Sequence, residues 1–179
     1  MGLDEALFCV GKTPGQIGRI VEAVVDAGRR MLLTRLDEAR FAALDEKIRA
    51  LLDYDPLSAT ARVGVARPPA DTARVAIVCA GTSDLRVARE AARTLEYYGE
   101  GVAEFNDVGV AGLHRLLSRI DAIRAHEVVI AVAGMDAALV SVVGGLVRAP
   151  VIAVPTSVGY GAVRGGETAL AASLASCAA

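Results

Sequence analysis

Short apolar runs along the chain each lead into a turn rich in Gly, Ser or Asp, and apolar positions at helical spacing follow each turn. Between Arg74 and Cys177 the pattern reads ARVAIVCAGTSDLRVA, then EVVIAVAGMDAALVSVVGG, then APVIAVPTSVGYGAVRGG. Strands that are apolar at every position are buried on both faces, and their alternation with helices is typical of a parallel sheet. Ligands of such sheets bind at the carboxyl ends of the strands, so we look for function in these turns.

The second part of the chain has the elements of a short flavodoxin-like domain. Strands are predicted over residues 74–80, 102–106, 127–133 and 151–154, and helices over about 83–98, 110–125 and 136–147. A Gly-rich loop over residues 156–166 leads into a last helix that runs to the end of the chain. The predicted fold class is α/β, with four parallel strands wound with helices.

The first part of the chain predicts a small α/β unit of its own. Thr13-Pro14-Gly15-Gln16 has the residues of a helix start, with Thr as N-cap, Pro at N1 and Gln at N3. A helix is predicted from there to Gly28, a strand over 31–34, and an amphipathic helix over 37–52. Periodicity fails in the Pro-rich stretch that follows. We therefore predict an N-terminal domain over 1–66, a linker over 67–73, and a second domain over 74–179.

Composition narrows the class of partner. The 179 residues are 54% hydrophobic with a formal net charge of −2, so a buried core is expected and a basic surface for nucleic acid is not. No apolar stretch is long enough to cross a membrane, and the N-terminus does not have the pattern of a signal peptide, so we expect a cytoplasmic protein with a small-molecule partner. The Ala- and Val-rich helices predict a homo-oligomer.

The turn Gly81-Thr82-Ser83-Asp84 offers two hydroxyls and free N–H groups where the first strand of the second domain enters its helix. Such a turn suits a phosphate or another anion, although capping of the helix by Thr82 or Ser83 explains the same residues equally well. Asp84 would repel a phosphate, which favours a ribose hydroxyl or a proton as its partner.

Three further turns carry candidate residues. His114 and Arg115 follow the glycines of the second turn, although a single His on a helix is more often structural. Gly134 and Asp136 end the third strand, where the carboxylate suits Mg²⁺ ligation, general base catalysis or, most simply, helix capping. The last turn is a Gly-rich binding loop or lid, with the candidate residues Ser157, Gly159, Tyr160 and Gly161.

These turns, taken together and in this order, resemble the LarB family of carboxylase/hydrolases in nickel-pincer nucleotide cofactor biosynthesis. The resemblance covers essentially the whole second domain through AGTSDLRVA, DVGVAGLHRLLSR, VAGMDAALVSVVGGL, PVIAVPTSVGYGA and the final SCA, and VGKTPGQI with LLTR resembles the amino-terminal unit of the family. The second domain is also similar, more distantly, to the PurE-like aminoimidazole ribonucleotide (AIR) carboxylases and mutases of purine synthesis.

The LarB resemblance implies a substrate, nicotinic acid adenine dinucleotide (NaAD), whose pyridinium ring is carboxylated by CO₂ before its phosphoanhydride is hydrolysed to release AMP. It implies Mg²⁺, an octameric assembly, and Cys177 as the nucleophile that forms a cysteinyl-pyridine adduct. Asp136 stands where many members carry Glu, in an acid/base or Mg²⁺-binding role. Members continue beyond Cys177 with a further strand and an Asn/Gly-rich tail, so the resemblance predicts that this sequence lacks one wall of the site.

Two other functions fit the same residues. A purine-pathway mutase would need no cysteine and would give His114 a central role. A nucleotide-binding module without catalysis would bind the ligand and would not turn it over.

Overall fold

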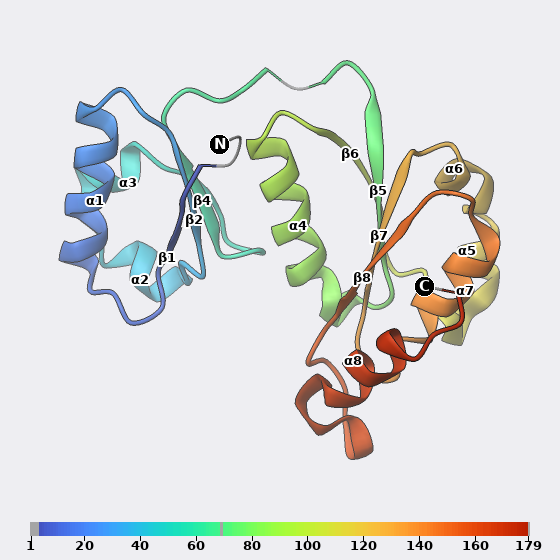
Figure 1. The fold of residues 1–179 in the computed structure, drawn as a ribbon. Helices are drawn as coiled ribbons and strands as arrows, with labels where there is room; N and C mark the ends of the chain where they lie inside the picture. The colour runs from blue at the N-terminus through green and yellow to red at the C-terminus, as the bar shows by residue number, and fades with distance from the viewer. Residues whose placement is uncertain (1–3, 69, 179) are drawn as a thin grey trace.

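The computed structural model describes residues 4–68 and 70–178. Two four-stranded sheets form the chain, and helix α4 (Leu85–Tyr97) lies between them (Figure 1). The strands of the first sheet lie between residues 6 and 63, and those of the second between residues 73 and 155.

The first sheet has the order β1-β2-β4-β3. Its strands are β1 (Ala6–Phe8), β2 (Met31–Thr34), β3 (Asp53–Asp55) and β4 (Thr60–Val63), of which β1 and β2 are parallel and the other pairs are antiparallel. Helix α1 (Pro14–Asp26) packs Ile17 and Val21 against one face of this sheet. The predicted start of this helix is confirmed, because the Thr13 hydroxyl accepts from the Gln16 N–H and the Gln16 side chain accepts from the Thr13 N–H.

The second sheet is entirely parallel, in the order β6-β5-β7-β8. Its strands are β5 (Ala73–Cys79), β6 (Gly101–Phe105), β7 (Val128–Ala133) and β8 (Val151–Pro155). The central strands β5 and β7 are buried because their Val, Ile and Ala side chains pack against helices on both faces. The α/β, flavodoxin-like fold expected from the sequence is therefore confirmed.

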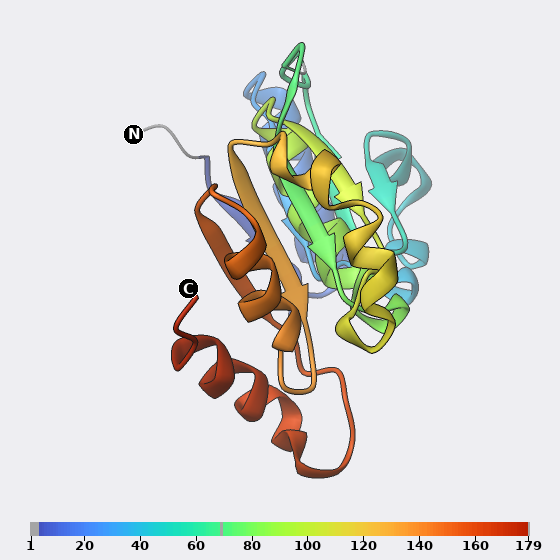
Figure 2. The ribbon, with the colours of Figure 1, turned by 90° about the vertical axis from the view of Figure 1, so that its right-hand side faces the viewer.

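Helices cover the two faces of the second sheet unequally. On one face are α5 (Leu113–Leu117), α6 (Ile120–Arg124) and α7 (Ala138–Leu146), whereas α4 covers the other (Figure 1). Helix α8 (Glu167–Leu174) follows a 3-10 turn at Gly161–Gly166 and lies along the edge of the domain (Figure 2).

Three predicted helices are wrong in extent. The helix expected over 37–52 is two short helices, α2 (Glu38–Ala42) and α3 (Glu46–Ala50), because the Asp45 carboxylate caps a second start. The helix expected over 110–125 is likewise divided into α5 and α6. The last helix ends at Leu174 instead of continuing to the end of the chain.

Helix α4 binds the first sheet through buried charge. The Arg93 guanidinium is only 4% exposed and donates to the Asp53 carboxylate at 2.9 Å, to the Asp53 carbonyl at 2.6 Å and to the Thr60 hydroxyl at 3.4 Å. One turn earlier, Arg89 donates to Asp55 at 3.1 Å and to Glu104 of β6 at 2.8 Å. The same helix is therefore part of both domains.

Within residues 4–68 and 70–178, no helix combines the length and the apolar character that crossing a membrane requires.

Candidate functional site

A crevice with a volume of about 350 Å³ lies at the carboxyl ends of β5, β6 and β7. Parallel strands bring the turns that follow them to one edge of the sheet, so segments far apart in the sequence meet there. Its lining consists of residues 80–84, 107, 109–111, 115, 133–136, 138, 139 and 158.

The turn after β5 contributes Thr82 and Ser83, whose side chains are exposed at the crevice. Neither hydroxyl caps the helix that follows, so the capping role that the sequence allowed is not the one observed. Both hydroxyls are therefore available to a bound molecule.

Asp84 has a different environment from its two neighbours. Its carboxyl group is 4% exposed, accepts from the Gly81 N–H at 3.1 Å, and accepts from the Thr156 hydroxyl at 2.6 Å. The Thr156 hydroxyl also accepts from the Val158 N–H at 3.2 Å. The carboxyl group thus ties the turn after β5 to the turn after β8.

The turn after β7 is strained on both sides of Asp136. Met135 and Ala137 have φ values of 57° and 51°, in the left-handed region that costs a residue with a side chain roughly 1–2 kcal/mol. The turn is held by hydrogen bonds from the Met135 N–H to the Val158 carbonyl at 2.8 Å and from the Ala137 N–H to the Gly134 carbonyl at 2.9 Å. Strained backbone of this kind clusters at functional sites, and here it presents an Asp at the crevice.

Gly134 is required by close packing at the start of that turn. A Cβ atom at this position would collide with the Val158 carbonyl and would lie 2.7 Å from the Thr156 hydroxyl oxygen. The turns after β7 and β8 are therefore in direct backbone contact.

The turn after β6 contributes Asp107 and Arg115. Asp107 has a φ of 55°, and the Arg115 guanidinium donates to its carbonyl at 2.7 Å. Gly109 makes the same turn lie close to β5, since its N–H donates to the Ala80 carbonyl at 2.7 Å. The crevice lining therefore carries one guanidinium, that of Arg115, which also contacts the Asp107 carboxylate at 3.4 Å.

Of the substrate-binding residues predicted from the sequence, six line the crevice: Gly81, Thr82, Ser83, Asp84, Arg115 and Gly134. Asp136, predicted as catalytic, also lines it. His114 is exposed on α5 and lies outside the lining, as do Ser157, Gly159, Tyr160 and Gly161 of the last loop, where Tyr160 is 81% exposed. That loop reaches the crevice through Val158 alone.

Sequence reasoning missed Asp107 and Met135 as members of the site. Asp107 follows directly after a strand and precedes Gly109, which is the same signal that identified Asp136 beside Gly134. Met135 carries no such signal, because an apolar residue in the left-handed region is visible only in the backbone.

Cys177 does not line the crevice of its own chain. It lies in the exposed segment after α8, where the neighbouring Ser176 hydroxyl is 2.8 Å from that of Ser141 on α7. The other two cysteines are buried, and burial raises the pKa of Cys9 to about 11 and that of Cys79 to about 12. Cys177 is thus the one thiol of the three that solvent reaches.

The carboxylates of the site can supply only part of the coordination of a metal ion, so a bound substrate would have to supply the rest. Among the described residues, no three Asp, Glu, His or Cys side chains are grouped as metal ligands. Mg²⁺ is often held by one or two carboxylates together with phosphate oxygens of the substrate, and Asp136 fits the protein part of that arrangement. Its Oδ1 atom has only a long contact, 3.4 Å, with the Ala138 N–H.

Comparison with known proteins agrees with the fold. Residues 74–178 match the family model of AIR carboxylase, which makes the second domain a PurE-like domain of the carboxylase type. Residues 1–65 match the LarB/PurE-like N-terminal domain. The chain therefore belongs to the LarB family, as its motifs predict.

An uncharacterized protein of Methanocaldococcus jannaschii is 34% identical over an alignment of 169 residues, and the alignment covers 89% of this chain and 65% of that protein. The chain thus spans slightly less than two thirds of the length of this relative.

Proposed function

We propose that this protein carboxylates the pyridinium ring of NaAD with CO₂, through a cysteinyl-pyridine adduct, and then hydrolyses the phosphoanhydride to release AMP. The observation that carries the proposal is the crevice of a PurE-like carboxylase domain in a chain whose first domain is of the LarB type. Its volume suits part of a dinucleotide, with Thr82 and Ser83 facing the polar backbone of the ligand.

The ring chemistry requires a temporary electron donor. A pyridinium carbon is electron-poor and does not attack CO₂, whereas addition of a thiolate at position 4 makes position 5 nucleophilic. C5 then forms the new bond to CO₂, a base removes the C5 proton, and expulsion of the thiolate restores the aromatic ring. Cys177 is the proposed nucleophile and Asp136 the proposed base.

Because Cys177 lies outside the crevice of its own chain, the proposed reaction uses Cys177 of one copy at the crevice of a neighbouring copy. The segment that carries it supports this arrangement, since Leu170 and Leu174 of α8 are 50% and 80% exposed. Apolar side chains exposed on one short helix are typical of a contact between subunits.

The hydrolytic step breaks the bond between a phosphorus atom and the bridging oxygen of the phosphoanhydride, and water supplies the new oxygen. Mg²⁺, when bound, would neutralise charge on the phosphates, with Asp136 as the protein ligand. Arg115 is the one cation of the crevice lining and would face the same phosphates.

The purine-pathway alternative has one observation in its favour, namely that the AIR carboxylase match covers the whole crevice. The position of His114 gives this alternative no support, because that side chain is exposed on α5 and, like Cys177, does not line the crevice of its own chain. The mutase reaction would give His114 the central role.

The test is mass spectrometry of products after incubation with NaAD, Mg²⁺ and bicarbonate. We expect a carboxylated mononucleotide and AMP from the wild-type chain and loss of carboxylation in Cys177→Ser. An alcohol supplies far less anion than a thiol near neutral pH. Cys9→Ser and Cys79→Ser are the matched controls and should retain activity as long as they fold. Normal carboxylation by Cys177→Ser would contradict the covalent mechanism.

A further inference from the structure

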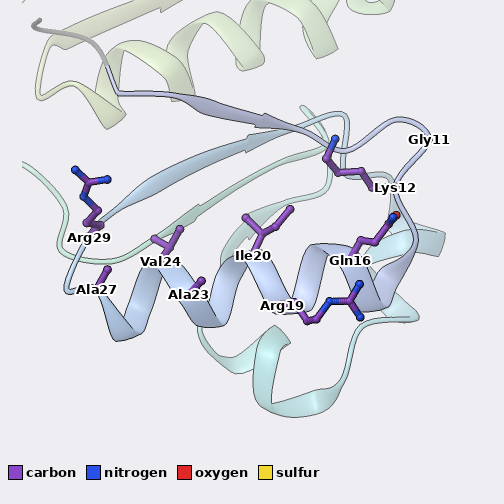
Figure 3. Close-up of a pocket in the computed structure, with 9 residues that line it drawn as sticks. All are labelled: Gly11, Lys12, Gln16, Arg19, Ile20, Ala23, Val24, Ala27 and Arg29. Atoms are coloured by element: carbon purple, nitrogen blue, oxygen red, sulfur yellow. The ribbon is translucent and has the colours of Figure 1, made fainter.

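A second hollow lies on the first domain and is separate from the crevice. It has a volume of about 640 Å³ and runs along helix α1 (Figure 3). Its lining, which we call the α1 groove, consists of Gly11, Lys12, Gln16, Arg19, Ile20, Ala23, Val24, Ala27 and Arg29. None of these residues lines the crevice of the second domain.

The α1 groove carries three cations and no carboxylate. Lys12 and Arg19 lie at the end where α1 begins, and Arg29 lies at the other end (Figure 3). Within the described part of the chain none of the three forms an ion pair, whereas Arg30, next to Arg29 in sequence, is paired with Asp4 at 2.8 Å. This charge stands out in a chain whose formal net charge is −2.

Gln16 adds a donor to the same end of the groove. Its Oε1 atom accepts from the Thr13 N–H at 2.9 Å, and its side-chain N–H groups can donate to a ligand. Together, Lys12, Gln16 and Arg19 offer an ammonium, an amide and a guanidinium, all of which donate. A phosphate group accepts several hydrogen bonds and carries the opposite charge.

Between its two charged ends, the α1 groove is lined by small and apolar side chains. Ala23 and Ala27 are one helical turn apart, so they form a flat strip beside Ile20 and Val24 (Figure 3). A planar ring can lie on small side chains of this kind, and the Arg29 guanidinium is suited to stack on such a ring. The volume is within the range of sites for small molecules.

We propose that the α1 groove binds a nucleoside monophosphate, with its phosphate at Lys12, Gln16 and Arg19 and its base on the Ala23–Ala27 strip. The charge selects the phosphate, and the flat apolar floor selects a planar base. This site would act in addition to the crevice and does not depend on the reaction proposed for it.

Photo-crosslinking of the full chain with 8-azido-AMP, followed by peptide mass spectrometry, separates the two sites by location. We expect label on peptides that contain α1, and we expect AMP to compete for it at a concentration at least tenfold lower than adenosine or inorganic phosphate requires. Arg19→Glu and Arg29→Glu should each reduce this labelling about tenfold, because each replaces a cation by an anion facing the ligand.

Two controls keep the result specific. Lys47→Glu changes an exposed cation of the same domain outside the α1 groove and should leave the labelling of α1 intact. Ser83→Ala changes the crevice and should do the same. Labelling confined to crevice peptides, labelling of α1 that Arg19→Glu leaves unchanged, or competition by phosphate as strong as by AMP would each overturn the proposal.

Discussion

At the scale of single residues, the carboxyl group of Asp84 is the clearest case in which position changes the role inferred from residue type. An Asp in the first turn of a helix at a strand end suggests a ligand contact. Both of its oxygens, however, are used inside the protein, by the Gly81 N–H and the Thr156 hydroxyl. Asp84 therefore holds two of the turns that shape the crevice.

Removal of the Thr156 hydroxyl tests this role. Thr156→Val keeps the shape of the side chain but leaves the Asp84 carboxylate without its 2.6 Å donor and the Val158 N–H without its acceptor. We expect the free energy of unfolding to fall by about 1–3 kcal/mol in urea denaturation, the cost of an unsatisfied buried polar group. The control is Thr168→Val, whose exposed hydroxyl bonds the Ala162 carbonyl and whose loss should cost less than about 0.5 kcal/mol.

At the scale of elements, the turn between β7 and α7 combines backbone strain with a candidate catalytic residue. Met135 is in the left-handed region at φ 57°, and its side chain is 40% exposed. Because packing holds that side chain only in part, the cost of its backbone conformation can be measured by a pair of substitutions.

We expect Met135→Gly to be more stable than Met135→Ala by about 0.5–1 kcal/mol in urea denaturation. Both variants lack the side chain beyond Cβ, and only Gly avoids the steric cost of this conformation. Ala171→Gly, at an exposed position inside α8, should instead destabilise by about 0.5–1 kcal/mol, because Gly is unfavourable in the middle of a helix. Equal stability of the two Met135 variants would mean that the turn is not strained.

The same elements show what the sequence could predict. The strands of the second sheet were predictable because residues such as Val75–Val78 are buried on both faces and leave an unbroken apolar run. The strands β1 and β3 were not, because each has only three residues, which is too short for an alternating or apolar pattern to be recognised. The division of the helix predicted over 37–52 was overlooked, although Asp45 is a recognisable cap.

The residues of the candidate site likewise fall into those that the sequence could predict and those that it could not. Polar residues two positions after a glycine at a strand end, such as Ser83 and Asp136, were found because parallel topology fixes where such turns meet. The positions of Tyr160 and Cys177 depend on how a long loop and α8 pack, which periodicity does not determine. The role proposed for Cys177 therefore rests on the reactivity of its thiol. Which crevice this thiol reaches depends on how copies of the chain assemble.

At the scale of the whole molecule, α4 makes the two domains dependent on each other. Arg93→Met should lower the free energy of unfolding by about 2–4 kcal/mol, because it removes three hydrogen bonds that a buried guanidinium donates to the first sheet. The loss can lie in the lower part of this range because the Asp53 side chain is 63% exposed, so water can replace the hydrogen bond that Arg93 donated to it. We expect one unfolding transition in the wild-type chain and two in the variant, measured by urea denaturation with separate probes.

Arg74→Met is the matched control for this substitution. Its ion pair with Glu100 is short, at 2.7 Å, but the Arg74 side chain is 50% exposed. Exposed pairs contribute about 0–1 kcal/mol, so the variant should unfold nearly as the wild type does. A similar loss in both variants would mean that the contact between α4 and the first sheet does not depend on the buried arginine.

We predict that copies of the chain associate through the apolar surface of the second domain. Ile152 of the edge strand β8 is 52% exposed, and Leu170 and Leu174 lie exposed on α8 at the edge of the domain (Figure 2). Burying such side chains in a symmetric contact is favourable and brings Cys177 near another copy. Light scattering should give a multiple of the 18.5 kDa chain mass, and Leu174→Glu should lower it. Leu57→Glu, an exposed Leu of the first domain, should leave it unchanged, and a wild-type monomer at micromolar concentration would reject both the assembly and the shared site.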